Sequence, residues 1–105
     1  MFELNSGNFE EEIIKKEGLS IVDFWSDTCE PCLALKPEFE MLANEFEGKV
    51  RFCSLETSKE RRLAISQKVL GIPTVILYKN GEKIGEAAKE FATKENIRKL
   101  IESVI

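Results

Sequence analysis

Short apolar segments of β-forming residues alternate with helical segments along most of this sequence. Residues 19–25 form a mostly apolar run, which is typical of a strand buried on both faces. The next segment begins near Pro31, a residue suited to the first turn of a helix, and apolar side chains recur at helical spacing as far as Phe46. Further strands are predicted over residues 49–55, 74–78 and 82–88, and further helices are predicted to begin at Asn8, at Thr57 or Ser58, and at Thr93.

The dipeptide Asn80-Gly81 is the strongest hairpin signal in the chain, and it joins the last two predicted strands as an antiparallel pair. The strand that follows it is more polar, so it is predicted to lie at an edge. The element order (β)αβαβαββα predicts an α/β fold with a single mixed central sheet and helices on both faces. A length of 105 residues, 43% of them apolar, predicts one domain over residues 1–105.

The charge balance disfavours two classes of partner, nucleic acids and anionic membranes. The chain has 15 basic and 19 acidic residues, a formal net charge of −4, so it lacks the basic surface that nucleic acids and anionic membranes require. No apolar run reaches the roughly 18 residues of a membrane span, and the first residues do not resemble a secretory signal. We therefore expect a cytoplasmic protein without nucleic-acid or membrane partners, and we expect it to act as a monomer.

The strongest chemical signal is Cys29-Glu30-Pro31-Cys32, which stands where a predicted strand passes into a predicted helix. Unpaired N–H groups and the positive end of the helix dipole favour an anion there, so we expect a lowered pKa for the Cys29 thiol. Cys32 follows one turn later, within reach of a disulfide. The pair predicts a two-step reaction in which Cys29 attacks a substrate disulfide and Cys32 then releases the reduced substrate.

Two other interpretations of the cysteine pair are weaker. A Cys-x-x-Cys sequence is half of many zinc sites, but zinc takes four ligands, and the chain offers only Cys53 in addition and no histidine. We therefore predict no metal. Two inert buried cysteines are the other alternative, which the position at a helix start disfavours.

Asp23 interrupts the apolar run of the strand that precedes the cysteine pair. A buried carboxylate costs several kcal/mol unless it is paired or protonated, so burial raises its pKa. A raised pKa suits a proton acceptor for Cys32 as that thiol becomes the second nucleophile. The alternative is that Asp23 faces solvent at a strand end.

Pro73, in Gly71-Ile72-Pro73-Thr74, directly precedes a predicted strand. Taken alone, this tetrapeptide favours an ordinary trans turn. In a chain that also has the cysteine pair, we expect a cis Ile72–Pro73 bond. That bond would expose the Ile72 backbone for pairing with an extended substrate segment.

Together these features resemble the thioredoxin family, and the match runs nearly end to end. The resemblance implies a thioredoxin fold and reduction of protein disulfides with no bound cofactor beyond the Cys29–Cys32 pair. It also implies recharging by a flavin-dependent thioredoxin reductase, fed by NADPH or, in some anaerobes, by another donor. The matching motifs are Val22-Asp23-Phe24-Trp25, the Cys-x-Pro-Cys pair, Pro37 inside the helix, Gly71-Ile72-Pro73-Thr74 and Tyr78-Lys79-Asn80-Gly81.

The resemblance also implies a role for each matching residue. Cys29 would be the attacking thiol, Cys32 the resolving thiol, and Asp23 the buried carboxylate beneath them. Trp25 would flank the site, and Pro73 would be the cis-proline that faces the disulfide. The expected substrate contacts are Trp25, Glu30, Pro31, Ile72, Pro73 and Lys89.

The chain departs from the family pattern around the cysteines. Glu30 places a negative charge beside the nucleophile, and Leu33 stands where the family usually has a basic residue. Both changes disfavour the Cys29 thiolate, so we predict a reduction potential at least as reducing as the family norm.

Further departures affect Asp23 and the groove. Ser54 takes the place of the family's buried lysine, so the pKa of Asp23 is expected to be higher still. Lys89 takes the place of a glycine that lines the groove, and with Thr28 it makes that surface more polar. Partners with a complementary charged surface are therefore implied.

The sequence is compatible with several hypotheses about the function. The chain could be a general reductase or one dedicated to a pathway, similar to thioredoxin variants encoded beside amino-acid reductase systems of anaerobic bacteria. A different class is a binding module that uses the groove around Trp25, Ile72 and Pro73 as a dock. An oxidase or isomerase is disfavoured by Glu30, and Cys53 is predicted to be a small core residue.

Overall fold

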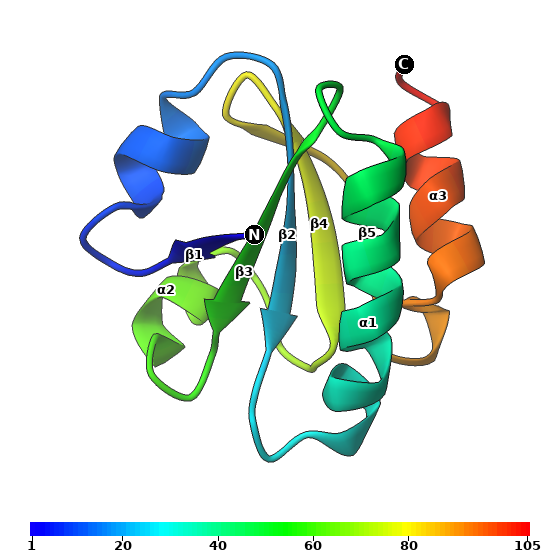
Figure 1. Ribbon diagram of the computed structural model, residues 1–105. Coiled ribbons are helices and arrows are strands. Elements are labelled where there is room, and N and C mark those ends of the chain that lie inside the picture. The colour runs from blue at the N-terminus through cyan, green and yellow to red at the C-terminus, as the bar shows by residue number, and fades with distance from the viewer.

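The centre of the computed structural model, which describes residues 1–105, is a five-stranded mixed sheet with the strand order β1-β3-β2-β4-β5 (Figure 1). Strand β3 is parallel to β1 and β2, whereas β4 is antiparallel to β2 and β5. The predicted α/β fold is confirmed. In chain order the elements are β1 (Phe2–Leu4), η1 (Glu10–Ile14), β2 (Leu19–Trp25), α1 (Glu30–Glu45), β3 (Arg51–Glu56), α2 (Arg61–Ser66), β4 (Thr74–Lys79), β5 (Glu82–Ala88), η2 (Lys89–Phe91) and α3 (Lys94–Glu102).

Strand β2 lies in the middle of the sheet and leads directly to the cysteine pair. Its residues are buried from Ser20 to Phe24, which accounts for the apolar run in the sequence. Within this strand Asp23 lies opposite Ser54 of β3 and Val75 of β4. The cysteine loop therefore follows the carboxyl end of a central strand, a place where reactive groups commonly gather in such sheets.

Helices cover both faces of the sheet, as predicted. Figure 1 shows α1 and α3 side by side on one face, with η1 and α2 on the other. Each face has its own apolar core, and Cys53 is fully buried in the core beneath η1 and α2, which confirms it as a core residue. The α1–α3 core includes Ile21, Leu35, Phe39, Leu42, Leu77, Ile97 and Ile101, and the other core includes Phe9, Ile13, Val22, Phe24, Leu55, Ile76 and Tyr78.

The segment between β3 and β4 differs from its prediction. Helix α2 begins only at Arg61, and neither Thr57 nor Ser58 caps it. The Thr57 hydroxyl instead donates to the Trp25 carbonyl oxygen at 3.1 Å, and Ser58 hydrogen-bonds the carboxylate of Glu56. These local bonds compete with helix capping, so the helix starts late. Ile65 of this helix is 64% exposed.

The remaining turns and caps follow the sequence more closely. Asn80 and Gly81 both have positive φ, as the predicted hairpin requires. Thr93 caps α3, since its hydroxyl oxygen accepts a hydrogen bond from the Asn96 N–H at 3.1 Å. The predicted cap at Asn8 is wrong: its side-chain oxygen accepts from the Asn5 N–H, outside the helical turn of η1. No helix has the length and apolar character needed to cross a bilayer.

Candidate active site

The cysteine pair lies at the junction of β2 and α1. Cys29 is the N-cap of α1, and its sulfur accepts a hydrogen bond from the Cys32 N–H at 3.3 Å. The two residues form a disulfide, with their Cα atoms 5.2 Å apart. Cys32 is buried, whereas Cys29 is half-buried. Cys29 is therefore the more accessible of the two cysteines, and it lies at the positive end of the helix dipole.

Asp23 is buried on β2, only 2% exposed, so the alternative that it faces solvent is wrong. One of its carboxyl oxygens, Oδ1, is buried without a hydrogen-bond partner. Burial raises the pKa of Asp23 to about 7, and the positive charge of Lys36 opposes part of this increase. The carboxyl group can therefore gain or lose a proton near neutral pH.

Lys36 was not singled out by the sequence. Its Nζ lies 3.6 Å from the centroid of the Trp25 ring, an arrangement typical of a cation–π interaction. The ring nitrogen of Trp25 is buried and has no hydrogen-bond partner. The available signal was spacing, because Lys36 follows Cys32 by four residues and thus lies on the same face of α1.

The Ile72–Pro73 peptide bond is cis, as expected for this tetrapeptide in a chain that also has the cysteine pair. Pro73 is buried and Ile72 is half-buried. The carbonyl oxygen of Pro73 accepts a hydrogen bond from the Lys89 N–H at 2.6 Å, and the Thr74 hydroxyl donates to the Gly71 carbonyl oxygen at 2.5 Å. These two bonds tie the proline loop to the end of β5 and to the start of β4.

Lys89 reaches across the proline loop with an exposed side chain. Its backbone has φ of 55°, a conformation that a lysine adopts less readily than a glycine. A side-chain carbon at Gly71 would collide with Lys89 Cε, so the lysine stem lies directly over that glycine. The ammonium group has no ion-pair partner. A free positive charge therefore stands at the rim of the site.

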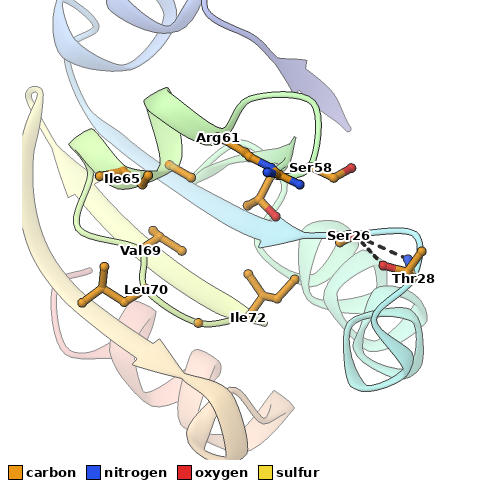
Figure 2. A pocket seen from close by; sticks show the side chains of 11 residues that line it. Ser26, Thr28, Ser58, Arg61, Ile65, Val69, Leu70 and Ile72 are labelled. Atoms are coloured by element: carbon orange, nitrogen blue, oxygen red, sulfur yellow. Dashed lines mark hydrogen bonds between the residues drawn. The ribbon is translucent and has the colours of Figure 1, made fainter.

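Two hollows flank the cysteine loop. Figure 2 shows the first, of about 350 Å³, with Ser26 and Thr28 on one side and the apolar side chains on another. The second is lined by Pro31, Pro73 and Lys89 among others, so the structure brings these three predicted contact residues together. The sequence did not identify several apolar residues that line the first hollow, namely Ile65, Val69 and Leu70.

Groups of metal-binding side chains are absent. No cluster of three or more histidine, cysteine, aspartate or glutamate residues is placed so that it could hold an ion. Cys53 is not suited to bind a metal ion as a thiolate, because it is buried in the core and burial raises the pKa of its thiol to about 11. The cysteine pair and the carboxyl group of Asp23 are the candidate reactive groups of this site.

Comparison with known proteins identifies relatives over the full length of the chain. The thioredoxin family model matches residues 1–103. A thioredoxin of Acetoanaerobium sticklandii is 47% identical over 105 residues, the whole of both chains. A thioredoxin of Peptoclostridium acidaminophilum is 50% identical over 101 residues, 96% of this chain and 92% of the relative. A thioredoxin of Staphylococcus saprophyticus is 33% identical over 99 residues, 94% of this chain and 92% of the relative.

Proposed function

The chain belongs to the thioredoxin family and is a thiol–disulfide oxidoreductase, and from this premise we propose that Cys29 is its nucleophile, Cys32 its resolving thiol and Asp23 the proton acceptor. The observation that supports this most is the unequal placement of the two sulfurs. Cys29 is the accessible N-cap of α1, while Cys32 is 1% exposed. The accessible thiolate can meet a protein substrate, and the buried thiol is held ready to attack afterwards.

In the first step, the Cys29 thiolate attacks one sulfur of a substrate disulfide. A bond forms between Cys29 and that sulfur, and the other substrate sulfur leaves as a thiolate. In the second step, Cys32 gives its proton to Asp23 and attacks Cys29. The enzyme disulfide forms, the second substrate thiolate leaves, and the substrate has gained two electrons. A carboxyl group with a pKa near 7 can accept that proton at neutral pH.

The substrate is proposed to lie in the groove beside the disulfide as a short extended segment. The Ile72 backbone, before the cis bond to Pro73, would pair with it in the manner of an added strand. The free ammonium group of Lys89 favours a partner with an acidic residue next to its disulfide. The proposed contact residues are Trp25, Glu30, Pro31, Ile72, Pro73 and Lys89.

We also propose the cellular setting and the partners of the protein. The chain acts as one domain over residues 1–105, in the cytoplasm and as a monomer. Its partners are disulfide-containing proteins and a reductase that restores the dithiol, and we propose that the reductase is a flavin-dependent thioredoxin reductase. No bound cofactor is needed, because both electrons are carried by Cys29 and Cys32.

Insulin reduction tests the activity directly. With dithiothreitol as the electron donor, the protein is expected to accelerate precipitation of the insulin chains, and Cys29→Ser is expected to abolish the acceleration. Cys53→Ser is the matched control, and it should keep the activity because Cys53 lies in the core. Failure of the unmodified protein to accelerate the reaction, together with stable binding to partner proteins, would instead support the docking module, which the comparisons do not favour.

A further inference from the structure

The buried carboxyl group of Asp23 has no positive charge beside it within the sheet. Its neighbours across the sheet are Ser54 on β3 and Val75 on β4. The titratable groups of β3 do not supply one. Arg51 lies opposite Ser20, at the other end of the strand, and is paired with Glu12. Cys53 is a buried thiol with a raised pKa, and the carboxylate of Glu56 accepts hydrogen bonds from Ser58. Of the two helices on this face, α1 packs on β2, whereas α3 packs on β4 and β5, so α1 is the element that can bring a cation to Asp23.

The only basic residue of helix α1 is Lys36. It lies one turn after Cys32, which is in the first turn of the same helix. Lys36 is half-buried, and its Nζ lies 3.6 Å from the centroid of the Trp25 ring. Trp25 follows Asp23 by two residues, so both side chains project from the same face of β2. The ring thus holds the ammonium group on the face that Asp23 also occupies.

We propose that Lys36 is a positioning residue for the second chemical step, in which its ammonium group, held over Trp25, supplies the positive charge that Asp23 lacks within the sheet. This inference rests on the proposed role of Asp23 as the proton acceptor for Cys32. It assigns Trp25 a second task beside substrate contact, because the face of an aromatic ring attracts a cation. It also gives a physical reason why a chain with Ser54 beside Asp23 can use that carboxyl group.

The sign of the effect follows from the charge. Burial raises the pKa of Asp23, and the positive charge of Lys36 lowers it again, leaving a value of about 7. Without Lys36 the pKa would rise further. At pH 7 about half of the Asp23 side chains are ionised in the unmodified protein. Without Lys36 the ionised fraction, which is the fraction able to accept the Cys32 proton, would be smaller.

The direct test is an NMR titration of the Asp23 carboxyl carbon in the oxidised protein. Lys36→Gln is expected to move the midpoint to higher pH by at least about 0.5 pH unit. Lys36→Arg keeps the charge and should leave the midpoint near that of the unmodified protein. Lys79→Gln is the matched control, because it removes the same charge from the far end of β4, opposite Leu19. An unchanged midpoint in Lys36→Gln would overturn the proposal.

A second measurement follows the pH dependence of insulin reduction. Lys36→Gln should lose about half of its rate at pH 7 and little at pH 9, where Asp23 is ionised in both proteins. In an Asp23→Asn background the same substitution should not change the profile. If the NMR midpoint moves but the rate profile does not, Asp23 is not the proton acceptor, and the proposed role of Lys36 in the second step is overturned with it.

Discussion

At the scale of single residues, Asp23 has a carboxyl group that folding removes from water. Its pKa of about 7 in the folded protein lies well above the value of 3.8 for an exposed aspartate. Between these two values the folded protein holds the proton more tightly than the unfolded chain does. The free energy of unfolding therefore falls as the pH rises through this interval, and above pH 7 the cost amounts to about 4 kcal/mol.

The substitution Asp23→Asn removes this cost while keeping the shape of the side chain. We expect it to raise the free energy of unfolding at pH 8 by up to about 4 kcal/mol and to change it little at pH 4. Urea unfolding of the oxidised protein at both pH values measures the difference. Asp27→Asn, at an exposed position in the next loop, is the control. Equal effects of Asp23→Asn at both pH values would contradict the raised pKa.

The sequence predicted the burial of Asp23 and the presence of Ser54 beside it, but not the approach of Lys36. An acidic residue inside an apolar run indicates burial because the strand pattern places its neighbours in the core. Lys36 gave no such signal, since a lysine on a helix is ordinarily solvated and its contact with Trp25 depends on how α1 crosses β2. The rim position of Lys89 was recognised only because the family has glycine there, and its path over Gly71 required coordinates.

At the scale of elements, helix α1 combines a reactive end with a buried flank. Its N-cap is Cys29, and an acidic residue, Glu30, occupies its first turn. The carboxylate of Glu30 is exposed, and it opposes formation of the Cys29 thiolate while the helix dipole favours it. The balance between these two charges sets the stability of the reduced form.

Neutralising Glu30 should therefore shift the reduction potential. We expect Glu30→Gln to make the potential less reducing by about 5–20 mV, because the Cys29 thiolate loses a repulsive neighbour. Equilibration with glutathione redox buffers measures the change. Glu40→Gln, on an exposed position farther along α1, should leave the potential unchanged. A more reducing value for Glu30→Gln would refute this account of the helix start.

Elements with strong local signals were predicted with the correct type and approximate bounds. Strand β2 and the hairpin at Asn80-Gly81 follow directly from their apolar pattern and turn residues. Helix α2 was predicted to start too early, because Thr57 and Ser58 use their hydroxyl groups for other local bonds. Which of several hydroxyl residues caps a helix depends on nearby partners that a sequence pattern does not contain.

At the scale of the whole molecule, the two apolar cores hold the sheet between pairs of helices and leave the cysteine loop at one edge. This architecture was predictable, since the order of strands and helices permits few topologies. The groove is less predictable, because its walls come from separate segments: the hollow in Figure 2 combines Thr28 with Ile65, Leu70 and Ile72. We propose that substrate choice depends on this surface rather than on the arrangement of strands and helices.

Trapping the mixed disulfide tests the central claim most directly. Reduced Cys32→Ser protein is mixed with insulin, quenched with iodoacetamide and mapped by mass spectrometry, with Cys29→Ser treated in parallel. The account predicts that insulin accumulates on Cys29 in the first variant, because the resolving thiol is missing, and that the second variant captures none. Insulin linked to Cys53, or no capture by Cys32→Ser although the unmodified protein reduces insulin, would contradict the assignment of Cys29 as the nucleophile.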